Sequence, residues 1–195
     1  MSIVGVNSIF PTVVGNCQRN DLIEPVKNII KNMKDDEWVE EGSASVNILD
    51  KDKKLKKDIT EEVQNYLKEA LSTETEIKMT TSWITKAVKG QPLNIHDHNN
   101  SWMSGCFYIQ DNCEIQFSTQ TPQIKVEPKV NTILNSSTIV YQPTAGTMLI
   151  FPSKTIVLIN STLNCECIFF IDWTFFKYLK ASLLWLCFAD ITPKK

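Results

Sequence analysis

Apolar positions recur with two different periods along this chain, and the change falls near Thr75. Before this point, apolar residues return every three or four positions, which is typical of helices with one buried face. After it, they alternate with polar residues or form short apolar runs, which is typical of strands. The pattern predicts helices first and then an antiparallel sandwich or barrel.

Two helices are predicted in the N-terminal part. The first covers residues 21–34, where Asp21 and Glu24 have the spacing of a capping box. The second is predicted to begin after Asp58 as its N-cap. The run at 50–58 is predicted to be a solvated loop, because aspartates interrupt its lysines and no aromatic residue accompanies them. The apolar stripe of the second helix is Ile59, Val63, Tyr66, Leu67, Ala70 and Leu71.

Eight or nine strands are predicted after Thr75. The first is long, Ile77–Ala87, with every second residue from Ile77 on a single face. This number of strands after two helices predicts an α+β fold that is mainly β. The predicted architecture is a double-stranded β-helix (jelly roll, cupin-like) with both helices packed outside. The shorter predicted strands are Leu93–His98, Trp102–Ile109, Cys113–Ser118, Gln123–Glu127, Ser137–Gln142, Thr147–Phe151, Thr155–Asn160 and Cys165–Trp173.

A length of 195 residues predicts one domain with a sizeable core. We place this domain at 1–175, with a helical part at 1–75 and barrel strands at 76–175. The tail, 176–195, is predicted to be helical. Packing on the barrel exterior and contact with a second copy in a homodimer are both compatible with its apolar residues.

Composition narrows the function classes. A net charge of −2 and a pI near 5.7 argue against a nucleic-acid partner. No run reaches the roughly 18–20 apolar residues of a membrane span. Without a signal peptide, the predicted location is the cytoplasm, or the host cytoplasm if the protein is viral. The six cysteines show no Cys-x-x-Cys spacing and are predicted to be reduced.

Both histidines of the chain lie two positions apart, as His96 and His98. In an extended strand, side chains at i and i+2 point to the same face, so the two imidazoles can hold one metal ion. The alternative is two polar residues that fall near a turn by chance. An Asn/Ser turn and the apolar strand 102–109, broken by Ser104 and Gly105, follow directly and favour a site.

Four stretches together resemble a small, largely uncharacterised family of 2-oxoglutarate/Fe(II) dioxygenases that is frequent in phage and marine bacterial genomes. They are IFPTVV (Ile9–Val14), TSWITKAVKGQPL (Thr81–Leu93), HDHNNSWMSGCFYI (His96–Ile109) and YQPTAGTMLIFPS (Tyr141–Ser153), and they occur in the family's order. The resemblance covers roughly residues 9 to 175. It implies a jelly roll, Fe(II) and 2-oxoglutarate as cofactors, an oxidoreductase (hydroxylase) activity on an unidentified substrate, and His96 and His98 as metal ligands.

The sequence departs from the family at two places. The family's third ligand histidine aligns near Val157, and its arginine for the 2-oxoglutarate carboxylate aligns near residues 165–167. The single arginine of this chain, Arg19, lies far from both. Substitute third ligands are Asp97, which requires a kink because it alternates with the histidines, Glu166 or Cys167, and Asp172. Lys154 is the candidate substitute for the arginine.

Three functional interpretations remain open at this point. The chain is an active dioxygenase with substitute ligands, a catalytically degenerate jelly roll that serves as a binding or structural module, or a cupin-like metal or sugar binder. Iron and 2-oxoglutarate binding separates the first from the other two, and a panel of glycans separates the third.

Overall fold

The computed structural model describes residues 12–34, 38–40, 43–44, 47–87, 95–98, 101–118, 130, 136–161 and 165–175. The helical elements are the 3₁₀ turns η1 (Asn20–Leu22) and η3 (Ile48–Lys51) and the helices α1 (Ile23–Lys31) and α2 (Lys53–Leu71). The strands are β1 (Gly15–Gln18), β2 (Trp38–Glu40), β3 (Ser43–Ala44), β4 (Ile77–Ala87), β5 (Met103–Tyr108), β6 (Cys113–Ser118), β7 (Thr138–Tyr141), β8 (Thr147–Pro152), β9 (Ile156–Ser161) and β10 (Cys165–Phe175).

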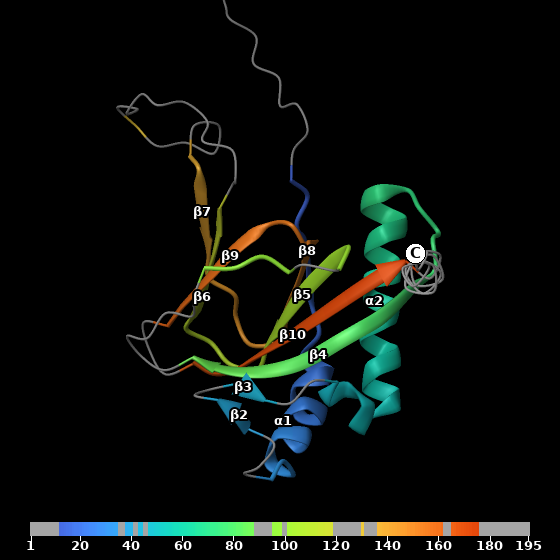
Figure 1. Ribbon diagram of the computed structural model, residues 1–195, viewed down its shortest axis with the longest axis vertical. Coiled ribbons are helices and arrows are strands. Elements are labelled where there is room, and N and C mark those ends of the chain that lie inside the picture. Colours follow the sequence, from blue (N-terminus) through green and yellow to red (C-terminus); the bar gives the residue numbers. More distant parts are fainter. Residues whose placement is uncertain are drawn as a thin grey trace, which may run out of the picture.

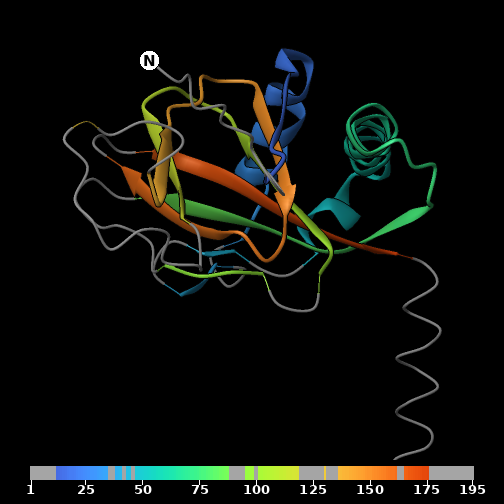
Figure 2. The same ribbon diagram turned by 90° about the horizontal axis from the view of Figure 1, so that it is seen from above.

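Two antiparallel sheets form the body of the protein. The large sheet has the order β1-β8-β5-β10-β4-β3-β2, and the small sheet has the order β7-β6-β9. Both helices lie on one side of the large sheet, and the small sheet lies on the other (Figures 1 and 2). This arrangement confirms the predicted mainly β jelly roll with two helices packed outside. No helix in the described part of the chain is long and apolar enough to cross a membrane.

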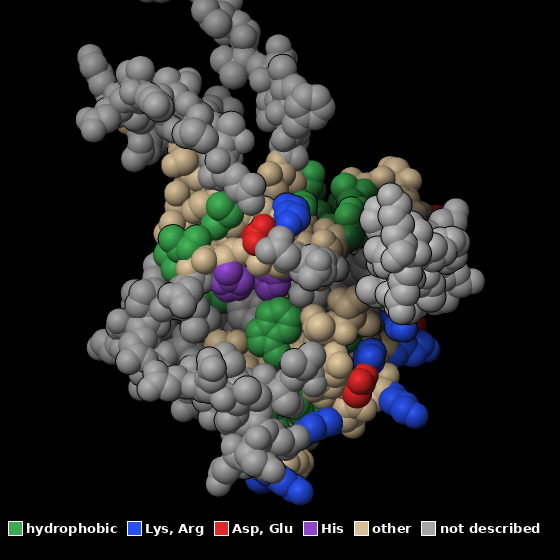
Figure 3. Space-filling model, viewed as in Figure 1, with side chains coloured by type: hydrophobic (Ala, Val, Ile, Leu, Met, Phe, Trp, Pro, Cys, Tyr) green, Lys and Arg blue, Asp and Glu red, His purple; other side chains and the backbone are tan. Residues whose placement is uncertain are grey.

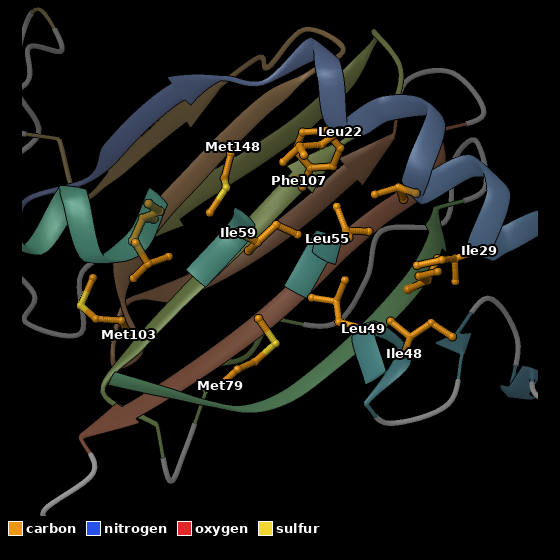
Figure 4. Close-up of a cluster of buried hydrophobic side chains, with 14 of the residues drawn as sticks. Leu22, Ile29, Ile48, Leu49, Leu55, Ile59, Met79, Met103, Phe107 and Met148 are labelled. Atoms are coloured by element: carbon orange, nitrogen blue, oxygen red, sulfur yellow. The ribbon is translucent and has the colours of Figure 1, made fainter. Parts of the chain in front are cut away.

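The large sheet is buried on both faces, so it separates two cores. Strand β5 is buried at every position because its alternate residues enter different cores. The helix-side core, part of which is shown in Figure 4, is Leu22, Val26, Ile29, Ile48, Leu49, Leu55, Ile59, Val63, Leu67, Ile77, Met79, Ile84, Met103, Phe107, Ile109, Met148 and Ile150. The barrel core is Cys106, Tyr108, Cys113, Ile115, Leu149, Phe151, Val157 and Ile159.

The first helix differs from its prediction at the N-terminus. It is preceded by η1, and its N-cap position, Leu22, makes no side-chain capping bond, so the predicted capping box is wrong. The Asp21 carboxylate instead accepts hydrogen bonds from the Arg19 guanidinium, with Nε at 2.9 Å. A charge-assisted pair with arginine competes directly with capping for the same carboxylate.

The second helix begins earlier than predicted. Its N-cap is Asp52, whose side chain accepts hydrogen bonds from the backbone N–H groups of Lys54 and Leu55, each at 3.0 Å. The prediction of a solvated loop at 50–58, and of Asp58 as the cap, is therefore wrong. Leu55 precedes Ile59 by four residues and extends the buried stripe by one turn, and lysine is a good helix former.

Strand β4 has the predicted bounds, but its side chains do not share one face. Its pairing with β10 shifts: β10 advances from Asp172 to Trp173, while β4 advances two positions, from Thr81 to Met79. This β-bulge reverses the alternation. As a result Met79 lies in the helix-side core, whereas Trp83 packs against the barrel core.

The other strand predictions are confirmed within one or two residues, with two exceptions. The predicted strand 93–98 is described only at 95–98, where it forms an isolated β-bridge. The predicted strand 123–127 and the tail 176–195 lie outside the described residues. Cys113 is disulfide-bonded, so the prediction that the cysteines are reduced is wrong at this position.

Candidate functional site

The two histidines are held beside the connection between β8 and β9. His96 and Val157 form an antiparallel bridge, in which the His96 N–H donates to the Val157 carbonyl at 3.1 Å and the Val157 N–H donates back at 2.9 Å. The His98 N–H donates to the Ser153 carbonyl at 2.9 Å. Main-chain bonds thus fix His98 to the connection between β8 and β9, and His96 to the start of β9.

The imidazoles of His96 and His98 lie side by side, as their spacing predicts. Their ring centroids are 5.1 Å apart, and the ring planes are tilted by 45°. Figure 3 shows both side chains on one face of the molecule. His96 is half-buried, and His98 is only 5% exposed. One imidazole therefore reaches solvent more readily than the other.

Aromatic side chains surround the deeper imidazole. Trp83 stacks on His98, with ring centroids 5.5 Å apart and an interplanar angle of 27°. Phe151 meets His98 edge-on at 6.2 Å, and Phe117 meets Phe151 edge-on at 5.2 Å. These contacts restrict the rotation of the His98 ring and lower the local dielectric around it.

Asp97 lies between the histidines and forms a different contact. Its carboxylate is paired with Lys154, with Oδ2 and Nζ 3.6 Å apart. The Lys154 side chain is 67% exposed, so this ion pair lies at the rim of the site. The structure thus brings together two residues that the sequence suggested for different roles, a third metal ligand and a co-substrate anchor. Neither role is tested by this contact.

Val157 occupies the place opposite His96. Directly opposite residues in an antiparallel pair project to the same face, with Cα atoms about 5.5 Å apart in a hydrogen-bonded pair. Val157 is fully buried in the barrel core. The position that the family resemblance assigns to a third histidine is therefore adjacent to His96, and an apolar side chain fills it.

Within the described residues, no three His, Cys, Asp or Glu side chains gather as a metal site. Glu166 and Asp172 belong to β10, where Asp172 pairs in register with Ser104 of β5 and Thr81 of β4. Their side chains lie outside the described part of the structure. As third ligands, both remain predictions.

Arg19 lies on the helix side of the large sheet and is not at this site. Its guanidinium pairs with Asp21 at 2.7 Å and with Glu62 at 2.5 Å. The hydrogen bond to Asp21 raises the pKa of Arg19 and lowers the pKa of Asp21. Arg19 therefore ties β1 to α2 and offers no anchor for a carboxylate near the histidines.

Two residues at the site, Ser104 and Ser153, were not among the predicted site residues. The hydroxyls of Ser104 and Ser153 lie 2.7 Å apart, and both residues are fully buried. Ser153 also supplies the carbonyl that holds His98. The available signal was a serine inside the mainly apolar stretch 102–109 and another directly after the apolar run 148–152, where a buried polar residue needs a partner.

The histidine pair fits part of an iron site. Two imidazoles that bind one ion at about 2.1 Å have ring centroids roughly 4.5–5.5 Å apart, which matches the observed separation. Non-haem Fe(II) oxygenases need three protein ligands on one face of the ion. The described residues therefore offer candidates for two of these three, and the ligand role of His96 and His98 stays a prediction.

Comparison with known proteins gives one family match and a group of structural matches. Residues 81–157 match a family model described as "Putative 2OG-Fe(II) oxygenase". EctD from S. alaskensis, solved with 2-oxoglutarate and 5-hydroxyectoine, has a TM-score of 0.61 at 10% identity, over 84% of this chain and 72% of that chain. AviO1 from Streptomyces viridochromogenes Tue57 has a TM-score of 0.58 at 10% identity, over 83% of this chain and 89% of that chain. HygX from Streptomyces hygroscopicus, with nickel and 2-oxoglutarate bound, has a TM-score of 0.57 at 7% identity, over 85% of this chain and 84% of that chain. No curated protein matches the chain.

At these identities the solved structures show a common fold. The family model adds the segment that carries the site: it begins in β4, includes both histidines and ends at Val157. The segment that carries both histidines is thus similar to the 2OG-Fe(II) oxygenase family model, and the fold is similar to that of proteins solved with 2-oxoglutarate bound.

Proposed function

We propose that this chain is an Fe(II)- and 2-oxoglutarate-dependent oxygenase in which His96 and His98 are the two imidazole ligands of the metal. The observation that carries the proposal is the pair of adjacent imidazoles, 5.1 Å apart, inside the segment that matches the family. Bound iron would supply the activation of O₂. The substrate is not identified by any residue at the site.

The residues around the histidines have distinct roles in this proposal. Trp83 and Phe151 hold the His98 ring and exclude water from its faces. Lys154, at the rim beside Asp97, binds a carboxylate of the co-substrate as a point charge. Asp97 then loses its ion-pair partner and joins Glu166 and Asp172 as a candidate third ligand.

A second function, a jelly-roll binding module without turnover, is favoured by Val157. A buried valine opposite His96 cannot coordinate iron, and two imidazoles hold a divalent ion less firmly than three ligands do. Weak metal binding is expected for both functions, so metal affinity does not distinguish them. Turnover of 2-oxoglutarate does.

Anaerobic titration of the purified protein with Co(II), a spectroscopic substitute for Fe(II), tests metal binding. We expect one ion per chain, and we expect His96→Ala and His98→Ala each to abolish binding. Lys57→Ala, at an exposed position on α2, is the control and should bind as the wild type does. Retention of Co(II) by both histidine variants would contradict the proposed ligands.

Turnover is measured as succinate released from 2-oxoglutarate in the presence of Fe(II) and O₂. Release that requires iron and is lost in His98→Ala supports the oxygenase. Stoichiometric metal binding without succinate release, across a broad set of candidate substrates, supports the binding module instead.

A further inference from the structure

Two buried serines face each other next to the histidine stretch. Ser104 comes from the middle of the large sheet, in β5, and Ser153 follows β8 directly. Both are 0% exposed, and their Oγ atoms are 2.7 Å apart. Each hydroxyl can donate or accept, so the pair satisfies both groups in a place where water does not reach.

The backbone of Ser153 connects this pair to His98. The Ser153 carbonyl accepts the His98 N–H at 2.9 Å, and the Ser153 N–H donates to the Trp102 carbonyl at 3.1 Å. The Thr155 N–H donates to the Pro152 carbonyl at 2.9 Å and closes the turn around Ser153. Any displacement of Ser153 therefore moves the main-chain acceptor of His98.

Folding stability alone does not require this pair. Replacing both partners of a buried hydrogen bond by apolar groups of similar shape is nearly neutral, whereas removing one partner leaves a buried polar group unsatisfied. Alanine differs from serine only by the hydroxyl and fills almost the same space. What two alanines lack is a directional contact that selects one position for the turn.

We propose that the Ser104–Ser153 hydroxyl pair positions the His98 imidazole for metal binding by fixing the main-chain acceptor of His98. The two serines are positioning residues and do not themselves contact the metal. The statement about metal binding rests on the proposed function, but the effect on His98 exists in the metal-free protein as well.

The double variant Ser104→Ala/Ser153→Ala tests the proposal. The matched control is Ser82→Ala, which removes another buried hydroxyl of the large sheet: the Ser82 Oγ accepts the Leu49 N–H at 3.0 Å on the helix side. Three quantities are measured for each protein: the thermal midpoint, the amide hydrogen exchange of His98 without metal, and the affinity and visible spectrum of bound Co(II).

We expect the double variant to keep a thermal midpoint close to that of the wild type. Its His98 amide should exchange at least about tenfold faster, because the acceptor is less well fixed. Its Co(II) affinity should fall by about 10–100-fold, the usual effect of losing an outer contact that orients a ligand. Ser82→Ala should lower the thermal midpoint and leave both His98 exchange and Co(II) affinity unchanged.

Unchanged His98 exchange and unchanged Co(II) affinity in the folded double variant would overturn the proposal. If the double variant does not fold, Ser104→Cys alone decides the question by the same two measurements, since the thiol fills the place of the hydroxyl but is only a weak hydrogen-bond donor and acceptor. Failure of the wild type to bind Co(II) would refute the proposed function, whereas the exchange rate of His98 still decides whether the serine pair positions it.

Discussion

The two faces of the large sheet differ in chemistry. The helix-side core consists mainly of aliphatic side chains, methionines and Phe107, contributed by both helices and by alternate strand residues, with the buried Ser82 hydroxyl bonded to the Leu49 N–H. The barrel side is richer in aromatic rings and also buries His98, Ser104 and Ser153. Apolar burial stabilises without directional demands, whereas each buried polar group needs a partner in one geometry.

This difference separates stability from chemistry within one sheet. The helix side contributes free energy of folding and holds the strands in register. On the barrel side, the rigid strands hold the buried polar side chains of His98, Ser104 and Ser153 in fixed positions, although burying polar groups costs free energy. Variants on the helix side should therefore change stability alone, whereas variants next to the histidines on the barrel side should change metal binding as well.

The largest expected effect on stability is at Ile59. This residue is 0% exposed at the centre of the α2 stripe, and Ile59→Ala should lower the free energy of unfolding by about 2–5 kcal/mol. Co(II) affinity of the folded fraction should not change. Urea unfolding gives the free energy, with the exposed Lys57→Ala as the control in the same helix. A loss below about 1 kcal/mol, or altered Co(II) binding, would break the division between the two faces.

An intermediate effect is expected at Val157. Val157→His places an imidazole opposite His96 and should raise Co(II) affinity by about tenfold or more, equivalent to about 1.4 kcal/mol. Ring insertion into a packed core should lower stability by about 1–3 kcal/mol.

Ile159→His is the matched control, because Ile159 is equally buried on the same strand but pairs with Ile115 and not with a histidine. We expect a similar loss of stability without tighter Co(II) binding. Equal Co(II) affinity in the two variants would show that the place of the third ligand is not at 157.

The smallest effect at neutral pH is expected at Tyr108. Burial, with contributions from Cys106 and Tyr141, raises the pKa of Tyr108 well above its usual value. The unfolded chain loses this proton near pH ~10 and the folded chain does not, so stability is retained below pH ~10 and falls as pH rises further. Tyr108→Phe should be nearly neutral at pH 7, because it keeps the buried ring and removes only a hydroxyl that makes no strong hydrogen bond among the described residues.

Urea unfolding at neutral and at alkaline pH measures this effect. Tyr108→Phe should reduce the alkaline loss of stability. The control is Tyr141→Phe, which removes a phenol that accepts a hydrogen bond from Asn16 and should leave the alkaline loss as it is in the wild type. An alkaline loss that is the same in wild type and Tyr108→Phe would show that Tyr108 ionises in the folded protein.

The sequence predicted the elements that depend on local alternation. Strand β6 and the long strand β4 have their predicted bounds, because period-two patterns report burial directly. The histidine pair could also be predicted, since two positions along an extended chain bring the side chains to one face.

Features that depend on tertiary contacts could not be predicted. The bulge in β4 arises from its pairing with β10. The start of α2 after Asp52 depends on the burial of Leu55 against the rest of the protein. Asp21 had two local candidates for its carboxylate, the helix N-terminus and Arg19 two positions before it, and the sequence does not decide between them. The bond between Ser104 and Ser153 spans 49 positions, a distance at which sequence pattern carries no information.

The bridge between His96 and Val157 is made by backbone atoms alone. Either side chain can therefore be replaced while the two hydrogen bonds persist, so the identity of the residue at 157 is uncoupled from the path of the chain. A substitution at 157, such as Val157→His, is therefore expected to keep the path of the chain beside His96.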